Sequence, residues 1–512
     1  MTAAGAETEA PPRPTRDILL DGRFVGGTRG EAADQLAGFI AAAAPATWLR
    51  GWFGGEAAAR LAADPRRLRL AIDRDIVAID ALIAAQLDAI LHHSRLRRLE
   101  GTWRGLAWLI GGIEPGGRIK VKMLNATWPD LVRDLERAAE FDQSQLFRKI
   151  YEEEFGTPGG EPYGLLLVDH AVRHRPAPGA PTDDIGALKL LAGVAAAAFA
   201  PTVLGAAPEL LALDGFADLA GLNDATAVLR GAEYARWRGL FVLEDTRFLA
   251  LTLPRLLARP PWHPSPLRAE PFRYEEDAPD TESRVWMNPA YAFAATVARA
   301  FAEYGWPADV RGVETDERGG GLVDELPLEP FSTEPGLIWA RPPLEVVLTD
   351  HQERALVDAG LMPLASLPWS EDGVFGAVRS LQTPRLFAGA AADAANANAR
   401  LSAQINSLLC VSRFAHYVKV LGRDMVGAFR TAEEIERQLQ TWLNRHINAN
   451  IGGGAESRAR YPLRAGRVTV RERPGRPGVF SSTIHLEPHF QLDDVSASFR
   501  LVTDIAAPGS VR

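Results

Sequence analysis

The sequence contains a single cysteine, Cys410, in the apolar run Leu-Leu-Cys-Val. One thiol can form neither an internal disulfide nor a cysteine-based zinc cluster, and this cysteine usage fits a reducing cytoplasm. In an apolar run a lone cysteine is most often a small buried side chain, and a nucleophilic thiol is the weaker alternative. We therefore expect Cys410 to be a core residue.

The common catalytic signatures are also missing. The sequence has no GxxxxGK[ST] phosphate loop, no GxSxG elbow, no HExxH and no CxxC. The glycines Gly319–Gly321 lack the lysine and the strand-to-helix setting of a phosphate loop, so a plain turn is the favoured interpretation over an anion cradle. His92 and His93 are adjacent, so on a helix their side chains diverge and make a poor metal site. We predict neither a metal nor a cofactor.

Membrane-directing segments are absent as well. The N-terminus lacks a basic region followed by an apolar one, so no signal peptide is predicted. The uncharged stretch 190–208 is dominated by alanine and glycine and is interrupted by Pro201 and Pro208. It predicts a buried helix leading into a buried strand, without membrane insertion. With 56 Lys and Arg against 65 Asp and Glu, the net charge of -9 also argues against a nucleic-acid partner.

What is present indicates an α/β fold of several domains. The chain has 512 residues, of which 47% are hydrophobic and 24% charged, as in ordinary globular proteins. Gly164–Asp169 has the pattern of a buried strand, Ile185–Ala200 that of a helix, and the run after Pro201 that of a second strand. Strand, helix and strand in this order predict a right-handed crossover and a parallel pair. We expect the same pattern later, with a helix at 291–305, a strand at 308–314, a strand at 344–350 and a helix from 351.

The two ends of the chain differ from this middle part. Residues 56–98 have the apolar spacing of helices, and Thr127 with Asp130 fits a capping box that starts another helix. Near the C-terminus, alternating residues predict a small antiparallel meander, which is marginal alone and must pack on the body or pair with another chain. We predict a disordered arm at 1–16, a mainly helical region at 17–98, a first α/β region at 99–259, a proline-rich linker at 260–284, a second α/β region at 285–451 and the β meander at 452–512.

Two Asp-His pairs are candidate catalytic groups. Asp169-His170 and Asp350-His351 each follow a predicted strand, and catalytic groups of open α/β sheets gather at the carboxyl ends of strands. The alternative is structural: Asp350 caps the helix that begins at His351, and Asp169 closes a turn. No nucleophile or phosphate loop accompanies either pair, so the structural reading is favoured.

The segment Ser412–Gly427 concentrates charge on one helix face. At 100° per residue, Phe414 and Val418 fall on one side, and His416, Lys419 and Arg423 fall on the opposite side. We therefore predict a helix that buries one stripe and shows a basic one, a candidate docking face formed by His416, Lys419 and Arg423. No carboxylate pair or nucleophile converges there, which argues against an active site.

Many segments between Leu99 and the C-terminus follow one another in a recognisable order, among them LEGTWRGL, EFDQSQLFRKIYEEEFGTPGGEPYGLLLVDH, AGVAAAAFAP, GGGLVDELP, NARLSAQINSLLCVSRFAHYVKVLGRD and ARYPLRAGRVTVRERPGRPGVF. Together they resemble one family, the large sheath subunit of bacterial type VI secretion systems (TssC or VipB). They cover about four fifths of the chain in family order. The N-terminal residues resemble the family least, and Arg16–Phe24 is a candidate donated strand there.

The resemblance implies a structural protein without a catalytic site. Such a subunit pairs with a smaller one (TssB or VipA), and neighbouring heterodimers stack into a contractile sheath around an inner tube of Hcp hexamers. The sheath stands on an envelope-bound baseplate in the bacterial cytoplasm, contraction drives the tube out of the cell, and a ClpV-type AAA+ ATPase dismantles the contracted form.

The resemblance also suggests roles for particular residues. In this family terminal strands join sheets shared between neighbouring subunits, and the candidates here are Val468, Val470, Ile484, Leu486, Phe499 and Leu501. The basic face would contact the inner tube or an adjacent subunit. Two other classes compete: an α/β enzyme that uses Asp169, Asp350 or His416, and an adaptor that forms a one-to-one complex without polymerising.

Overall fold

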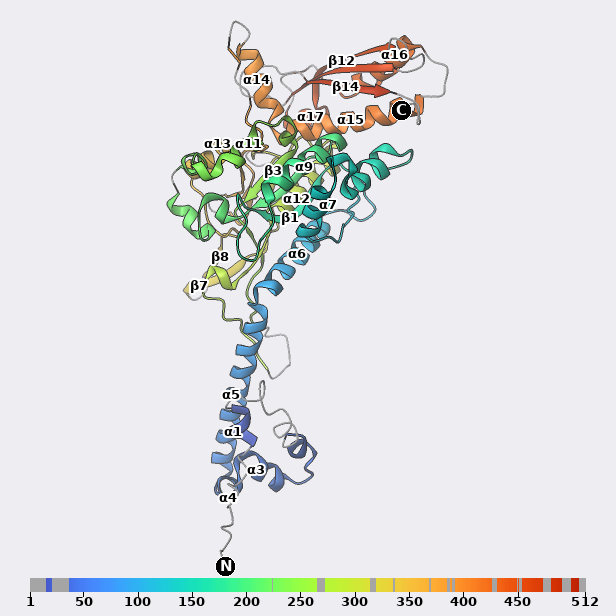
Figure 1. Cartoon of the computed structure of the whole chain (residues 1–512). Coiled ribbons are helices and arrows are strands. Elements are labelled where there is room, and N and C mark those ends of the chain that lie inside the picture. Colours follow the sequence, from blue (N-terminus) through green and yellow to red (C-terminus); the bar gives the residue numbers. More distant parts are fainter. Residues whose placement is uncertain are drawn as a thin grey trace, which may run out of the picture. The chain divides into compact units, whose positions relative to one another are not determined.

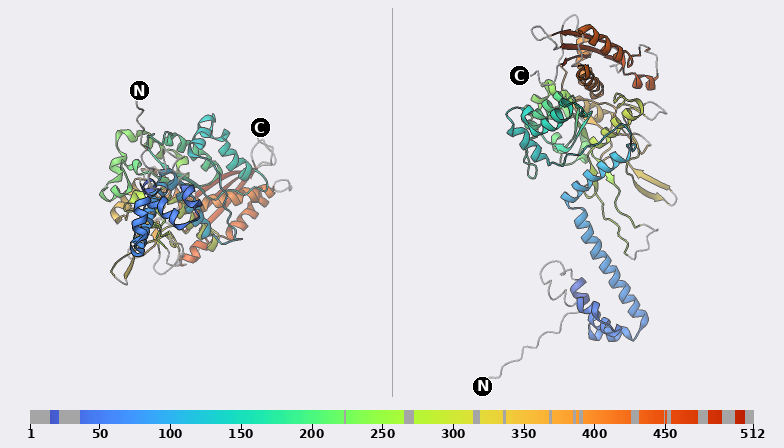
Figure 2. Two further views of the ribbon diagram at one scale, coloured as in Figure 1. Left: turned by 90° about the horizontal axis from the view of Figure 1, so that it is seen from below. Right: turned by 90° about the vertical axis from the view of Figure 1, so that its right-hand side faces the viewer.

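The structure is a computed structural model and describes residues 15–20, 36–222, 224–264, 272–313, 319–334, 337–367, 370–384, 387–388, 392–425, 431–448, 450, 454–472, 480–489 and 499–505. The chain divides into two compact units (Figures 1 and 2). Unit 1 combines residues 1–97 with 261–284, and unit 2 combines residues 98–260 with 285–512.

Unit 1 is built from helices α1 (Thr15–Leu20), α3 (Pro45–Phe53), α4 (Gly55–Ala62) and α5 (Pro65–Leu91). The Asp64 side chain caps α5 by accepting the backbone N–H groups of Arg66 and Arg67, and Pro65 occupies the first turn. The buried carboxylate of Asp75 in α5 accepts from Arg16 Nε at 2.9 Å and from Trp52 Nε1 at 2.8 Å. This one aspartate therefore ties α1 and α3 to α5.

The expectation of a donated strand at Arg16–Phe24 is wrong for its first part, because residues 16–20 lie in helix α1, and residues 21–24 lie outside the described residues. Of the predicted arm at 1–16, residues 1–14 also lie outside them. The second segment of unit 1, which contains the short helix η8 (Thr281–Ser283), contacts α5 and the residue after it. Tyr274 donates its hydroxyl to Asp88 at 2.5 Å, and Glu276 lies 3.2 Å from His92 Nε2.

Unit 2 contains the parallel sheet predicted from the sequence. Strands β1 (Leu166–Val172), β2 (Thr202–Ala206), β3 (Leu249–Leu253) and β9 (Met362–Pro363) lie in that order, and each neighbouring pair is parallel. Helix α9 (Asp184–Ala198) crosses from β1 to β2 and is mostly buried, as is β2. The uncharged stretch is thus a core helix leading into a core strand, and the mixed α/β fold class is confirmed.

The other elements of unit 2 are helices and small antiparallel sheets, and α6 begins at Ser94, before the first residue of the unit at Arg98. The helices from residue 94 onward are α6 (Ser94–Gly111), α7 (Trp128–Arg137), η2 (Phe141–Gln143), α8 (Gln145–Phe147), the π-helix η3 (Arg148–Gly156), η4 (Pro208–Leu211), η5 (Phe216–Gly221), α10 (Ala225–Leu229), η6 (Ala232–Tyr234), α11 (Ala235–Phe241), η7 (Glu244–Phe248), α12 (Ala290–Tyr304), α13 (Asp350–Asp358), α14 (Ala392–Ser402), α15 (Ile405–Met425), α16 (Ala432–Asn444) and α17 (Ala455–Arg460). The small antiparallel sheets pair β4 (Leu256–Arg259) with β5 (Val285–Met287), β7 (Glu329–Glu334) with β8 (Leu337–Arg341), and β10 (Ala365–Ser366) with β11 (Gly373–Val374) and β6 (Leu322–Val323).

Two predicted strands of the later α/β pattern do not form. Residues 308–313 make no strand, because Gly312 adopts a φ of +68° and its N–H bonds to Phe375 O in a turn, and residue 314 lies outside the described residues. Residues 344–350 make one isolated bridge, between Leu344 and Leu256. The predicted helix cap also shifts by one residue. Thr349, not Asp350, caps α13, in a capping box with Gln352.

The C-terminal meander has its own core. Strands β12 (Leu463–Glu472), β13 (Phe480–Pro488) and β14 (Phe499–Ile505) form an antiparallel sheet in that order. Its buried side chains, such as Val468 and Ile484, join a cluster with Phe414 of α15 and Leu439 of α16. Cys410 belongs to the same cluster, where burial raises the pKa of its thiol to about 12. The meander therefore packs on α15 and α16 (Figure 1).

Candidate functional site

The first edge of the C-terminal sheet, along β12, is covered by the chain itself. The backbone N–H of Val468 donates to Gln440 Oε1 at 2.8 Å, and that of Val470 donates to Glu436 Oε2 at 2.9 Å. At the start of the strand, Leu463 exchanges backbone hydrogen bonds with residues 446–448. Side chains of α16 thus bond to backbone N–H groups of β12 that would otherwise pair with another strand.

The other edge, along β14, is open within the described residues. Strand β13 pairs on both sides, so it is central, whereas no described strand pairs with β14 on its outer side. In an antiparallel ladder, the backbone groups of successive residues point alternately to the two neighbouring strands. The N–H groups of Val468 and Val470 point away from β13, so their partners on β13, Ile484 and Ser482, bond to β14. The residues of β14 opposite these two point toward β13, and the N–H groups of the alternate residues Arg500, Val502 and Asp504 therefore point away from it. These three residues form the free edge of β14.

The structure places the six residues predicted for strand pairing in different settings. Val468, Val470, Ile484 and Leu486 are buried side chains of the sheet's own core. They lie on the edge that α16 covers or on the central strand. Phe499 and Leu501 lie on β14, and their backbone groups point toward β13. Pairing with another chain remains a prediction, and β14 is the strand where the described structure leaves room for it.

His416 is not exposed on the predicted basic face. Its side chain is 2% exposed, its Nε2 donates to Ala198 O at 2.9 Å, and its ring packs edge-on against Phe155. Burial lowers the pKa of His416 to about 4. The expectation that this residue contributes to an exposed stripe is therefore wrong, because residues 148–157 cover that face of α15.

Lys419 and Arg423 also contact this segment of the same chain. The Lys419 ammonium lies 3.7 Å from the centre of the Phe155 ring and 3.1 Å from the Tyr151 hydroxyl. Arg423 donates to the backbone carbonyls of Phe155 at 2.7 Å and of Thr157 at 2.8 Å. These carbonyls lie at the C-terminal end of η3, where a cation and extra donors stabilise a helix. We call this contact between α15 and residues 151–157 the α15 clamp.

Docking of Lys419 and Arg423 on a partner remains a prediction. Replacing both by glutamate tests it, since unchanged assembly with other proteins would contradict a docking role. Because the same change also breaks the α15 clamp, the doubly substituted chain must first be shown to be folded by circular dichroism.

We expect the Arg423→Ala variant to lose about 2–4 kcal/mol in the free energy of unfolding. Two charge-assisted hydrogen bonds disappear, and the carbonyl of the buried residue Phe155 loses its donor. Arg437→Ala, on an exposed face of α16, is the matched control and should change stability by less than about 0.5 kcal/mol. Equal urea midpoints for the two variants would show that the α15 clamp contributes nothing.

We expect the stability of the chain to fall as the pH falls from about 6.5 to 4, partly because of His416. The folded-state pKa lies below the unfolded value, so the unfolded chain takes up the proton first and is favoured as the pH drops. The contribution is about 3 kcal/mol, since one pKa unit corresponds to about 1.4 kcal/mol. His416→Gln keeps a donor for Ala198 O without a titrating group, so its unfolding free energy should fall less steeply over this range. Parallel pH curves for the two proteins would contradict this assignment. Burial also lowers the pKa values of His446 and His489, so some slope will remain.

The predicted catalytic pairs are engaged in structural contacts. Asp169 lies within β1, not after it, and accepts from Thr102, Asn288 and Tyr291. Asp350 is the first residue of α13, where an acidic side chain favours the helix. Asp169 is bonded to two hydroxyls and an amide and not to a histidine, whereas His170 is bonded to Asp184, so Asp169 and His170 do not form one acid–base unit.

Asp184 was not predicted as a site residue from the sequence, but its carboxylate accepts more hydrogen bonds than that of Asp169. It is 4% exposed and accepts from Trp128 Nε1 and Thr182 Oγ1, both at 2.8 Å, and from His170 Nε2 and the Arg173 N–H, both at 3.0 Å. Burial raises its pKa, but the hydrogen bond and charge of His170 and the other donors lower it more, so the net shift is downward. The sequence feature that could have indicated its importance is its position in the first turn of α9, a helix that is otherwise almost uncharged.

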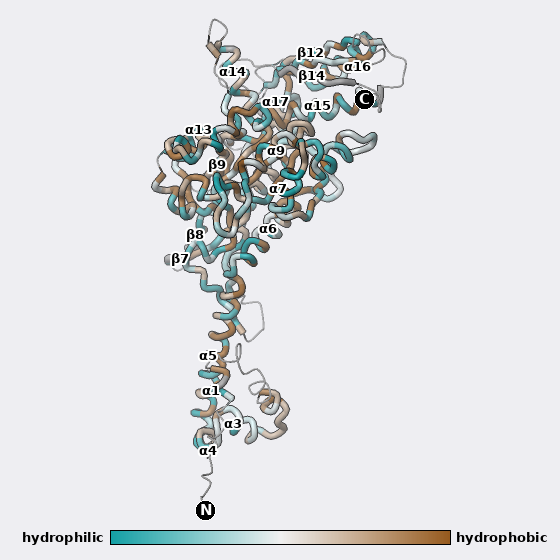
Figure 3. Tube along the Cα trace, viewed as in Figure 1, coloured by the Kyte–Doolittle hydropathy of each residue, from teal (hydrophilic) through white to brown (hydrophobic). Residues whose placement is uncertain are grey.

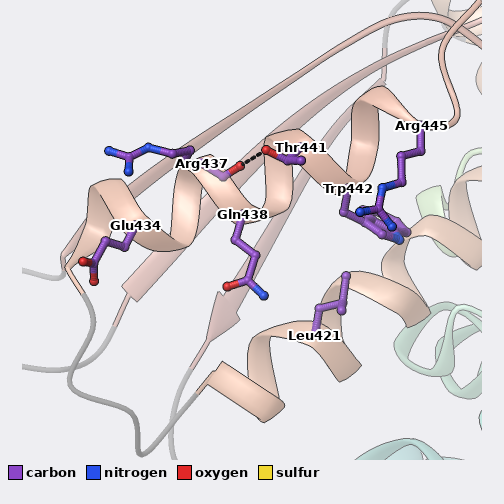
Figure 4. Close-up of a pocket in the computed structure, with 7 residues that line it drawn as sticks. All are labelled: Leu421, Glu434, Arg437, Gln438, Thr441, Trp442 and Arg445. Atoms are coloured by element: carbon purple, nitrogen blue, oxygen red, sulfur yellow. Dashed lines mark hydrogen bonds between the residues drawn. The ribbon is translucent and has the colours of Figure 1, made fainter.

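Two grooves in the surface of unit 2 are lined by other residues. A groove of about 600 Å³ lies between α15 and α16 (Figure 4) and is lined by Leu421, Glu434, Arg437, Gln438, Thr441, Trp442 and Arg445. A second groove of about 400 Å³ shares Trp442 and is lined by further aromatic rings, among them Trp306 and Tyr417. Neither contains a pair of carboxylates or a nucleophile beside a base.

Metal sites and membrane-spanning helices were considered over the whole described part of the chain. No three His, Cys, Asp or Glu side chains in it are grouped so that they could hold a metal ion. None of its helices is by itself long and apolar enough to cross a membrane, although α5 and α6 taken together pass the same test of length and composition.

Comparison with known proteins identifies relatives over most of the chain. Residues 73–382 match the family model VipB, described as "EvpB/VC_A0108, tail sheath N-terminal domain", and residues 394–505 match VipB_2, the "tail sheath gpW/gp25-like domain". The type VI secretion system sheath protein TssC1 of Pseudomonas aeruginosa is 36% identical over 439 residues, which cover 85% of this chain and 86% of that protein. A chain in the cryo-EM structure of the anti-feeding prophage baseplate aligns with a TM-score of 0.31 and 10% identity, over 69% of this chain and 73% of that one. The two family models together extend from within α5 to the end of β14.

Proposed function

The chain belongs to the VipB family of type VI secretion sheath proteins, and from this premise we propose that it is the large subunit of a contractile sheath. The subunit pairs with a small TssB/VipA-like subunit, and the pairs polymerise around an inner tube of Hcp hexamers. Contraction of this sheath propels the tube and its effectors out of the cell.

The free edge of β14 is the observation that carries this proposal. A strand edge normally risks aggregation, and proteins usually cover it. Here the N–H groups of the β12 edge bond to side chains of α16, whereas within the described residues no strand pairs with the outer edge of β14. A strand from a neighbouring subunit would complete the sheet, and the repeat of this contact from subunit to subunit generates an open helical lattice.

Helix α5 gives independent support for a stable partner. Its apolar residues include Ile76, Val77 and Ile83, which are 50%, 67% and 44% exposed in unit 1 (Figure 3 shows the apolar residues along α5). A helix that exposes such residues along several turns is typical of a subunit that is covered in its assembly. We assign the small sheath subunit as the occupant of this face.

The other partners follow from the same role. Neighbouring sheath heterodimers contact each other through the C-terminal sheet, the inner tube passes through the sheath, and the baseplate nucleates it in the bacterial cytoplasm. A ClpV-type AAA+ ATPase dismantles the contracted form. The proposal assigns no nucleic acid and no membrane insertion to this subunit.

The family is one of structural sheath proteins and not a class of enzymes. We propose that this chain likewise catalyses no reaction. The competing α/β enzyme would need Asp169, Asp350 or His416 as a reacting group. The hydrogen bonds of Asp169, the helix-terminal position of Asp350 and the burial of His416 argue against each of them.

A secretion assay tests the proposal in the host. Deleting the chain should abolish release of the tube protein into the medium, and the wild-type chain supplied in trans should restore it. Normal release by the deletion strain would contradict a sheath role. An adaptor that forms only a one-to-one complex could pass this assay, so assembly itself must be examined separately.

A further inference from the structure

Residues Ile119–Leu124 form a short segment of unit 2 that has the properties of a strand but no neighbour. Neither helix nor turn is present between Ile119 and Ala126. Lys120 and Lys122 form ion pairs with Glu161 and Glu154, whereas the intervening residue Val121 is exposed. This two-residue alternation is that of an extended chain.

The backbone of residues 119–123 makes no hydrogen bonds within the described part of the chain. No N–H or C=O group of residues 119–123 has a partner there, and the first bond beyond them joins Ala126 N to Leu124 O. Backbone groups of a folded protein are nearly always paired with protein or with water. A run of five residues without a protein partner therefore offers donors and acceptors to another strand.

The segment also exposes apolar side chains. Val121 and Met123, which alternate with the lysines, are 45% and 61% exposed, and Leu124, on the side of the lysines, is 52% exposed. The cationic side chains are already neutralised by the two glutamates, and the Lys122 ammonium also lies 5.5 Å from the centre of the Tyr163 ring. The segment is thus held in place by alternate side chains, and it would select an occupant by backbone pairing and apolar contact and not by charge.

We propose that Ile119–Leu124 is an acceptor strand that pairs with an apolar β-strand of the small sheath subunit. This inference rests on the proposed function. Pairing of the segment with itself in a second copy would be isologous and would close a dimer, which cannot propagate a sheath. The β14 edge provides for contact between neighbouring subunits, so the acceptor strand is assigned to the second subunit of the pair.

Hydrogen exchange measured by mass spectrometry tests the pairing directly. In the chain alone the amides of residues 119–124 should exchange as fast as those of an unfolded peptide, and in the complex with the small subunit at least 100-fold more slowly. Fast exchange in a complex that has formed would overturn the inference and leave the proposed function intact. Protection already present in the chain alone would show that a segment of this chain is the occupant, which also overturns it.

Proline substitutions separate the backbone from the side chains. Val121→Pro and Leu124→Pro remove N–H groups of opposite strand edges, and neither N–H is bonded within the described residues, so both variants should fold like the wild type. We expect at least one of them to bind the small subunit at least 100-fold more weakly. The controls Val121→Thr and Leu124→Thr should bind within about threefold of the wild type.

If both proline variants bind like the wild type, the segment is not an acceptor strand. If the wild-type chain itself does not bind the small subunit, the proposed function fails, and the inference that rests on it fails with it.

Discussion

Replacing Val502 by proline is expected to abolish assembly of sheath tubes while the chain itself remains folded. The N–H of Val502 points away from β13, so its loss spares the sheet of this subunit and removes a donor from the free edge. A lost hydrogen bond and the steric conflict of the proline ring together cost about 1–3 kcal/mol at each contact. Because the contact repeats along the lattice, tubes should be missing from electron micrographs.

Val502→Thr is the matched control, since threonine is also β-branched and keeps the backbone donor. It should assemble like the wild type. Leu501→Pro offers a contrast, because its N–H points toward β13, and we expect this change to disturb the sheet itself. Tubes of normal length and number from the Val502→Pro variant would show that the β14 edge does not pair between subunits.

Replacing Asp184 by alanine is expected to destabilise unit 2 by about 3–5 kcal/mol. The indole of Trp128, the backbone N–H of Arg173 and the imidazole of His170 all lose their acceptor in a buried setting. The free energy lost on removing the shared acceptor exceeds the net stabilisation by its hydrogen bonds, because the donors stay buried and unpaired. The free energy of unfolding can be measured by circular dichroism in urea.

Asp184→Asn provides the control for charge. Its carboxamide oxygen still accepts from Trp128 and Thr182, so the loss should be smaller, about 1–2 kcal/mol. A loss below 1 kcal/mol for Asp184→Ala would contradict the view that this carboxylate organises the N-terminal end of α9. Neither variant is expected to change a catalytic rate, because the proposal gives Asp184 no substrate.

Patterns confined to neighbouring residues predicted much of the fold. Apolar composition over a short run was enough to predict β1, α9 and β2 as elements: β2 is buried throughout and α9 mostly so. The expected burial of the first strand is wrong, because β1 is the edge strand of its sheet and residues 164–169 are only partly buried or exposed. Thr127 at the start of α7 was likewise identified, because a capping box depends on residues three positions apart. The strand expected at 308–314 failed because Gly312 turns the chain, and the bonds that hold this turn come from Phe375 and Gly321.

The candidate sites depended on partners that lie far away in sequence. His416 is polar and follows the pattern of an exposed face, but it is buried by residues near Phe155, which helical periodicity within Ser412–Gly427 cannot reveal. In the same way, alternation identified β12 and β14 as strands without showing that α16 covers one edge and leaves the other open. The domain boundaries predicted from the sequence, including the linker at 260–284, stay predictions.

Electron microscopy of the chain co-expressed with a small TssB/VipA-like sheath subunit is the most direct test of whether this protein forms a sheath. We expect hollow helical tubes whose wall contains both proteins, and we expect the tubes to disappear with the Val502→Pro variant but not with Val502→Thr. A discrete complex that does not polymerise, or a stable monomer that does not bind the small subunit, would contradict the claim that this chain is a sheath subunit.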